Sequence, residues 1–194
     1  LLSNIFLECV VAPSFDKEAL KILHNKKNLR LLQLNKENIK KDNESTFKSI
    51  LGGILEQDID NEVDQTNEWS CVTQIKPISE EFNDLRFSWK ICKHVKSNAI
   101  VISKNQQTIG IGAGQMNRVG AAKIALDSAK DSAHGAVLAS DGFFPFSDSV
   151  EIANQYGIKS IIQPGGSVRD QESIDMCNEL GISMIFTNKR HFLH

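Results

Sequence analysis

Residues 97–118 read SNAIVISKNQQTIGIGAGQMNR, and this stretch carries the clearest fold signal in the chain. Short runs rich in apolar and β-branched residues predict one strand at residues 99–103 and a second at residues 107–111. The polar residues 104–106 between them predict a turn. A glycine-rich segment then leads into a helix predicted at residues 117–130. The stretch therefore predicts two neighbouring strands followed directly by a helix.

Strands and helices also alternate on both sides of this stretch. The other predicted elements are, in chain order, a strand at 6–12, a helix at 16–23, strands at 29–34 and 47–57 (the second with a bulge at Gly52 and Gly53), a helix at 79–96, a strand at 136–139, a helix at 147–156, a strand at 159–163, a helix at 169–180 and a strand at 183–186. The polar segments 35–46 and 58–66 are predicted as connections, the first a solvated loop or a short helix. Such alternation predicts an α/β sheet with short loops.

The bulk composition excludes several classes of protein. The 194 residues are 41% hydrophobic, which is enough for a core, and the net charge of -2 argues against a general nucleic-acid surface. No apolar run approaches the ~20 residues of a membrane helix. The four cysteines form no CxxC pair, so we expect reduced thiols that act as small buried hydrophobes in a cytoplasmic protein. The chain opens at Leu1 without Met, and we interpret it as a fragment.

The first loop with a composition suited to ligand binding is residues 110–118. In α/β folds, ligands bind where strands pass into helices. Gly110, Gly112 and Gly114 allow a ligand to approach the backbone closely, and Arg118 in the first turn of the helix is placed to bind a phosphate. A tight hairpin turn explains the glycines equally well. The GxGxG spacing differs from the GxGxxG of dinucleotide-binding oxidoreductases, which disfavours that class.

Two further strand-to-helix loops and the C-terminal tail suggest parts of the same site. Residues 140–146, SDGFFPF, offer an aromatic wall for a flat heterocycle, or phenylalanines that simply fill the core. Residues 163–170, QPGGSVRD, offer backbone donors and the Ser167 hydroxyl, or an ordinary capped helix start. Arg190 follows a buried strand, so it is either a second anion contact or part of a frayed tail. Together these loops predict a pocket for a phosphorylated heterocycle.

These motifs, taken in order as SNAIV, GIGAGQMNR, SDGFFPF, PGGSVRD and RHF, resemble the aminoimidazole carboxamide ribonucleotide (AICAR) formyltransferase domain. In that family the domain follows an inosine monophosphate (IMP) cyclohydrolase domain in one polypeptide. The resemblance covers nearly all of the chain. It implies that residues 79–194 form the C-terminal subdomain of the formyltransferase, and that residues 1–78 link it to a first subdomain. The first subdomain and the cyclohydrolase domain are absent from the chain.

The resemblance also implies a fold and an activity. The fold would be a cytidine-deaminase-like three-layer α/β sandwich without the zinc site, because the HxE and PCxxC motifs are missing from the chain. The family transfers a formyl group from 10-formyltetrahydrofolate to AICAR in IMP synthesis. Its members are cytoplasmic homodimers with the active site at the dimer interface.

The residues that match the family's binding positions can be named. Nucleotide binding is implied for Asn98, Arg118 and Arg190. Folate binding is implied for Val119, Phe143, Ser167 and Val168. Some members bind potassium near the positions of Ser97 and Asp141.

No catalytic residue is predicted in this chain, because the family's Lys-His pair lies in a KHxNPCG-type motif that the sequence lacks. Lys93 and His94 are not followed by Asn-Pro-Cys, and we interpret them as a solvated pair on a helix. We therefore expect the fragment to be inactive alone. The alternative hypothesis is a non-catalytic nucleotide-binding module, which would not need to bind folate.

Overall fold

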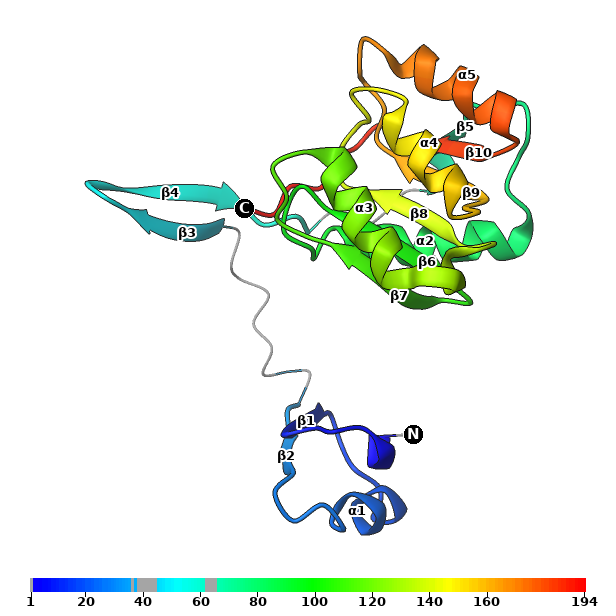
Figure 1. Cartoon of the computed structure of the whole chain (residues 1–194). Coiled ribbons are helices and arrows are strands. Elements are labelled where there is room, and N and C mark those ends of the chain that lie inside the picture. Colours follow the sequence, from blue (N-terminus) through cyan, green and yellow to red (C-terminus); the bar gives the residue numbers. More distant parts are fainter. Residues whose placement is uncertain (1, 36, 38–44, 62–65) are drawn as a thin grey trace. The chain divides into compact units, whose positions relative to one another are not determined.

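The computed structural model of the protein describes residues 2–35, 37, 45–61 and 66–194 (Figure 1). The chain forms two compact units, residues 1–59 and 60–194, and each is described by itself. The connections predicted at 35–46 and 58–66 lie partly outside the described residues. The division expected after residue 78 concerns the parts of a longer protein and stays a prediction.

The unit at residues 60–194 is built on a six-stranded sheet. Its strands are β5 (Ser70–Cys71), β6 (Ile100–Lys104), β7 (Gln107–Gly112), β8 (Val137–Ser140), β9 (Ser160–Gln163) and β10 (Ser183–Phe186). Their order in the sheet is β5-β10-β9-β8-β6-β7. Strands β8, β9 and β10 run parallel, and the pairs β5–β10, β6–β8 and β6–β7 are antiparallel. The sheet is therefore mixed, with a parallel centre and antiparallel edges.

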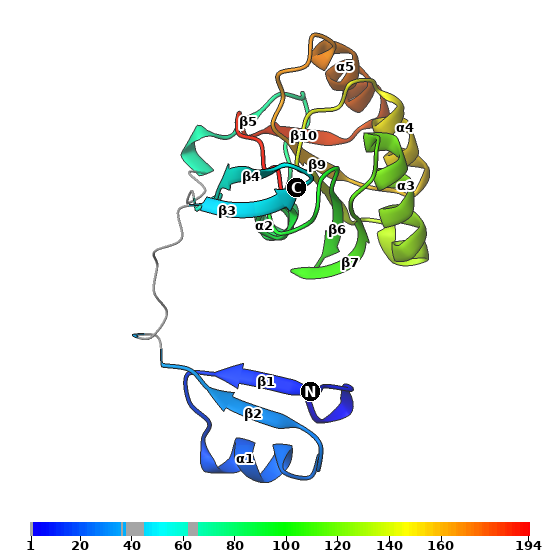
Figure 2. The ribbon, with the colours of Figure 1, turned by 90° about the vertical axis from the view of Figure 1, so that its left-hand side faces the viewer.

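Helices cover both faces of this sheet. They are α2 (Ser79–Cys92), α3 (Arg118–Ala129), α4 (Asp148–Gln155) and α5 (Asp170–Leu180), with short 3-10 helices η3 (Thr66–Glu68) and η4 (Lys130–Ala133). Figure 2 shows α3, α4 and α5 on one side of the sheet and α2 on the other. Alternate strand residues serve the two cores: Ile100 and Ile102 pack under α3, while Val101 packs against Leu85 and Trp89 of α2. The predicted three layers are present in this unit.

The elements predicted from residue 79 onward all form, with small differences at their ends. The helix predicted at 79–96 ends at Cys92, and its first turn is closed by the Glu81 carboxylate, which accepts the Ile78 backbone N–H at 3.1 Å. The short edge strand β5 was not predicted, because two residues give no periodic signal. Among the described residues, no helix has both the length and the apolarity to cross a bilayer.

Two glycines predicted to admit a ligand instead let a helix approach a strand. A Cβ atom on Gly110 would collide with the Ala125 carbonyl of α3, and one on Gly112 with the Ala121 carbonyl. Only hydrogen at these positions allows α3 to lie so close to β7. The turn before β7 is fixed separately, because the buried Asp84 carboxylate accepts the Asn105 and Gln106 backbone N–H groups at 2.9 and 2.6 Å.

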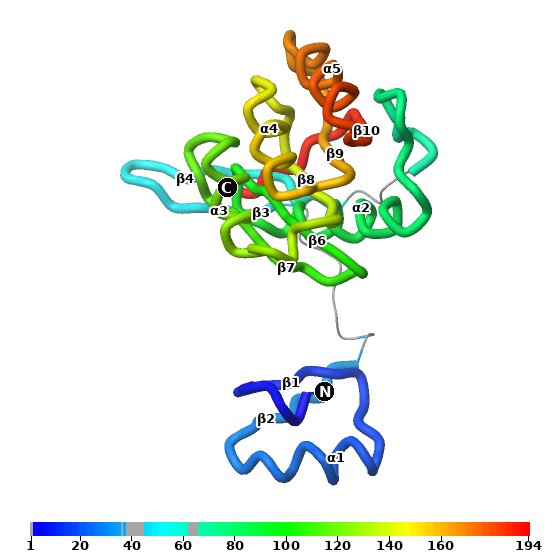
Figure 3. The backbone as a smooth tube through the Cα atoms, turned by 45° about the vertical axis from the view of Figure 1, so that its right-hand side comes forward, coloured from blue at the N-terminus to red at the C-terminus, as the bar shows by residue number. Residues whose placement is uncertain are grey.

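Residues 1–59 contain a βαβ segment and a hairpin. The short 3-10 helix η1 (Leu2–Asn4) precedes β1 (Cys9–Ala12), α1 (Lys17–Leu23) and β2 (Arg30–Gln33), and the two strands pair in parallel with α1 beside them (Figure 3). The hairpin consists of β3 (Ser45–Ile50) and β4 (Gly53–Asp58). The prediction of one bulged strand at 47–57 was wrong. Gly52 has φ +82°, and this left-handed conformation reverses the chain.

Candidate functional site

A cavity of about 420 Å³ lies where four segments of residues 60–194 meet. The segments precede β6, begin α3, follow β8 and follow β10. They meet because β8 and β10 are parallel and end at the same edge, while the antiparallel β6 begins there. The lining residues are Asn98, Met116, Asn117, Arg118, Gly142, Phe143, Pro145, Arg190 and Phe192. All three residues predicted to bind a nucleotide are therefore brought together, with one predicted to bind folate.

Arg118 is a buried cation at the base of α3. Asn117 caps the helix by accepting the Gly120 N–H at 2.7 Å, which fixes the backbone from which the Arg118 side chain projects. Its Nη1 atom pairs with Oδ1 of Asp141, a residue with no exposed surface. A buried charge of this kind needs its partner, so Asp141 determines the orientation of the guanidinium group. The Arg118 Nε atom has no hydrogen-bond partner within the described part of the chain.

Asp141 joins three of the segments around the cavity. Its Oδ2 accepts a hydrogen bond from the Ser97 hydroxyl at 2.6 Å, and its carbonyl accepts the His191 N–H at 3.0 Å. Its own N–H donates to the Ala99 carbonyl at 3.2 Å. The carboxylate is thus shared between Arg118 and Ser97. The sequence offered Asp141 as a metal ligand, a helix cap or an anchor for substrate amino groups, and the family resemblance implied a potassium position there. Its role in holding Arg118 was missed.

Gly142 was also missed, although it stands in a motif that the sequence singled out. A Cβ atom there would collide with Nη2 of Arg118. A glycine near a strand end can mark a place where another group approaches the backbone closely, but the sequence does not say which group. Of the neighbouring phenylalanines, Phe144 is fully buried in the core and Phe143 lines the cavity, so both interpretations of that loop apply, each to a different ring.

Arg190 and Phe143 form the second charged feature of the cavity. The Arg190 guanidinium carbon lies 4.8 Å from the centre of the Phe143 ring. Such stacking limits the rotamers of an exposed arginine and leaves its N–H donors available at the edge. Asn98 lies on another wall, where its Nδ2 donates to the Gln115 carbonyl at 2.7 Å. The cavity therefore combines two guanidinium groups, the amides of Asn98 and Asn117, and the rings of Phe143 and Phe192.

The other predicted site residues do not line this cavity. Val119 is half-buried in α3, and Val168 is fully exposed. The Ser167 hydroxyl accepts the Arg169 N–H at 3.1 Å in a turn before α5, whose N-cap is Arg169 and not Ser167 as the capped-helix interpretation expected. His94 is exposed, and neither it nor Lys93 is among the lining residues. The structure thus places Phe143 in the cavity and the rest of the expected folate set outside it.

The thiols differ from expectation in two of four cases. Cys92 and Cys177 are buried as predicted, but Cys9 of β1 and Cys71 of the edge strand β5 are exposed. Burial, together with the negative charge of Asp141, raises the pKa of the Cys92 thiol, and the nearby Arg118 charge offsets part of this. Burial alone raises the pKa of Cys177 to about 12. Neither buried thiol is suited to act as a nucleophile.

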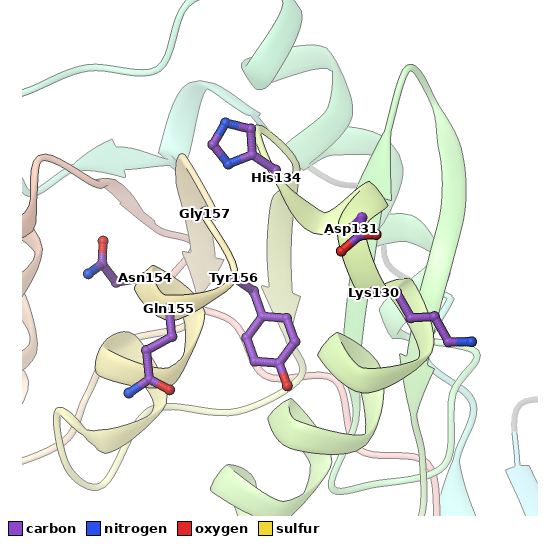
Figure 4. Close-up of a pocket in the computed structure, with 7 residues that line it drawn as sticks. All are labelled: Lys130, Asp131, His134, Asn154, Gln155, Tyr156 and Gly157. Atoms are coloured by element: carbon purple, nitrogen blue, oxygen red, sulfur yellow. The ribbon is translucent and has the colours of Figure 1, made fainter.

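A second hollow of about 510 Å³ lies at the opposite edge of the sheet, before β8 and β9. Figure 4 shows its lining residues, among them Lys130, His134 and Tyr156. The Tyr156 hydroxyl donates to Asp127, and this hydrogen bond is the main cause that raises the pKa of Tyr156. None of the predicted site residues lies in this hollow.

Comparison with known proteins bears on the chain as a whole. A family model described as AICARFT/IMPCHase bienzyme matches residues 1–128. Proteins named bifunctional purine biosynthesis protein PurH are similar over all of this chain. Those of Prochlorococcus marinus strains CCMP1986 and MIT 9515 are each 66% identical, over 193 and 194 residues respectively. The chain spans 37% and 38% of the length of these two relatives.

Solved structures give weaker matches. RibD of Acinetobacter baumannii, form 2, aligns with a TM-score of 0.38 and 17% identity, covering 56% of this chain and 35% of that chain. A Thermotoga maritima protein titled diaminohydroxyphosphoribosylaminopyrimidine deaminase/5-amino-6-(5-phosphoribosylamino)uracil reductase aligns with a TM-score of 0.34 and 18% identity, covering 55% and 34%. These scores are too low to support an argument.

Proposed function

Because the chain belongs to the AICARFT/IMPCHase bienzyme family, we propose that it is the C-terminal part of an AICAR formyltransferase domain. In the complete protein, this domain transfers a formyl group from 10-formyltetrahydrofolate to AICAR, beside an IMP cyclohydrolase domain. The proposal includes the cytidine-deaminase-like form of the three-layer fold, a cytoplasmic location, and a homodimer with the active site at its interface.

The observation that carries this proposal is the meeting of Arg118 and Arg190 on one cavity. Two guanidinium groups suit a phosphate, since each can donate two parallel N–H bonds to its oxygens. The cavity volume of about 420 Å³ is in the range of small-molecule sites. Asn98, Arg118 and Arg190 would bind the nucleotide. Phe143 would contact the folate, with Val119, Ser167 and Val168 completing that pocket outside the present cavity.

The chemical role of these residues is to position the two reactants. The amine of AICAR attacks the formyl carbon and the bond from that carbon to N10 of the folate breaks. The amine loses a proton and N10 gains one, which leaves tetrahydrofolate. Holding two reactants in contact removes a large part of the barrier of such a reaction. The proton acceptor would be the histidine of the family's KHxNPCG-type motif, which this sequence lacks. We therefore propose that the 194-residue chain binds ligand but does not transfer the formyl group.

Potassium binding near Ser97 and Asp141 stays a prediction. The Asp141 side chain bonds Arg118 and the Ser97 hydroxyl. No cluster of three or more His, Cys, Asp or Glu side chains within the described segments could hold a metal ion. The absence of zinc stays a prediction.

The proposal is tested by titrating the chain with AICAR in a calorimeter. Replacing Arg190 with Met should raise the Kd for AICAR about tenfold or more, since a hydrogen bond to a charged group is lost. The matched control is Arg86→Met, because Arg86 is an exposed arginine of α2. Failure of the unmodified chain to bind AICAR would remove the nucleotide site. Binding of AICAR without binding of a folate analogue would favour the nucleotide-binding module instead.

A further inference from the structure

The C-terminal segment, residues 187–194, carries two cavity side chains although it forms no helix or strand. Arg190 and Phe192 line the cavity, while His191 between them is 4% exposed and lies outside the lining. Alternate residues of an extended segment point to opposite sides. The side chain of His191 therefore anchors the segment on the side away from the cavity.

His191 is held by contacts from three directions. Its Nδ1 atom pairs with Oδ2 of Asp60, which lies 131 residues earlier in the chain. Its ring lies 4.4 Å from the ring of Trp89, a buried core residue of α2. Its backbone N–H donates to the carbonyl of Asp141, whose carboxylate pairs with Arg118. The same residue thus connects both arginines of the cavity to the core.

The ends of the segment are held by other bonds. Thr187 and Asn188 donate their backbone N–H groups to Gln163 and Pro164, both at 3.0 Å. At the far end, Ser97 and Leu193 exchange hydrogen bonds of 2.9 and 3.2 Å. Arg190 stands between these two fastened ends. The His191 side chain is well placed to determine how the middle of the segment lies against the cavity.

We propose that Asp60 is a positioning residue for ligand binding, and that it acts through His191 to hold Arg190 over Phe143. This proposal rests on the proposed function, because it takes Arg190 as a contact to the phosphate of the nucleotide. Asp60 lies far from the cavity motifs in sequence and is not among the residues that line the cavity. No motif or spacing in the sequence singles it out. The pair joins the start of this unit to its last residues.

The test is Asp60→Ala in the full 194-residue chain, with two ligands titrated in parallel. The ligands are AICAR and its riboside, which lacks the phosphate. Loss of the pair should raise the Kd for AICAR about tenfold and leave the Kd for the riboside nearly unchanged, because only the contact from Arg190 is misplaced. The matched control is Glu68→Ala, which removes the exposed Lys189–Glu68 pair of the same segment at 3.7 Å and should change neither Kd.

A second variant guards against a general loss of structure. His191→Phe keeps a ring against Trp89 and loses the bond to Asp60, so it should reproduce the selective loss of AICAR affinity. An equal loss for both ligands, or a tenfold effect of Glu68→Ala, would mean that the pair only supports folding and would overturn the proposal. So would wild-type AICAR affinity in Asp60→Ala when Arg190→Met has lost binding. If the unmodified chain binds no AICAR, the proposed function fails first and this inference falls with it.

Discussion

The two units of the chain differ in how completely they bury their apolar residues. Residues 60–194 place a sheet between helical layers, and both faces have fully buried cores. Of the hydrophobic side chains among the described residues of 1–59, only Leu23 is buried, while Val11, Leu32, Phe47 and Leu55 are more than half exposed. Parallel strands are normally covered on both faces, and an isolated hairpin is marginally stable. The same alternation of elements therefore yields a core only where a further layer is present.

The largest expected difference in stability between the two units comes from truncating one leucine in each. Leu138→Ala in β8 removes a fully buried side chain and should lower the free energy of unfolding by about 2–5 kcal/mol, from lost burial and the cavity left behind. Leu32→Ala in β2, where the side chain is 53% exposed, should cost less than about 1 kcal/mol. Urea unfolding measures both. Equal losses would contradict the difference in burial between the two units.

A smaller effect is expected from adding one methyl group to a glycine of each unit. Gly112→Ala places a Cβ against the Ala121 carbonyl, so α3 must move away from β7, at a cost of about 1–3 kcal/mol. Gly53→Ala meets nothing closer than the Ile50 Cγ1 at 3.8 Å and should change stability by less than about 1 kcal/mol. Thermal unfolding measures the stability lost in each variant. It shows whether Gly112 is needed for close packing of α3 on β7 or only for a flexible turn.

The smallest effect concerns the buried Cys177 in alkali. Its folded pKa of about 12 lies above the ordinary thiol value of 9.0, so the unfolded chain loses this proton first as the pH rises. Its contribution to stability is complete below pH 9 and is lost between pH 9 and 12, by about 1 kcal/mol at pH 10. Cys177→Ala should therefore show a shallower fall in stability from about pH 8 to 10 than the unmodified chain. Cys9→Ala, at an exposed thiol of β1, should retain the full fall.

Prediction from sequence succeeded where burial is two-sided and the periodicity is regular. The run of Ile100, Val101 and Ile102 predicted a strand, and the structure buries each of these residues fully between two layers. Prediction failed at residues 47–57, because an apolar run with central glycines fits a bulged strand and a hairpin equally well. Prediction also placed the exposed Cys9 and Cys71 in a core, since a sequence does not say which strand residues the fold leaves exposed.

For the candidate site, the residue types could be predicted locally but their partners could not. The compositions of the loops around Arg118, Phe143 and Arg190 correctly indicated three residues that line the cavity. No local pattern indicated a role for Asp141 in holding Arg118, or for Gly142 or Asp60. Each of these residues acts on a side chain far away along the chain, and local patterns do not report such contacts.

The sequence by itself determined the alternation of strands and helices from residue 79 onward and the family to which the chain belongs. Only the tertiary structure showed that Gly110 and Gly112 allow α3 to pack closely against β7. It also showed that the buried carboxylate of Asp141 holds Arg118. The physical reason is that the hydrophobic periodicity of helices and strands is local along a chain. Close packing and charge pairing depend instead on which segments the parallel strands bring to one edge.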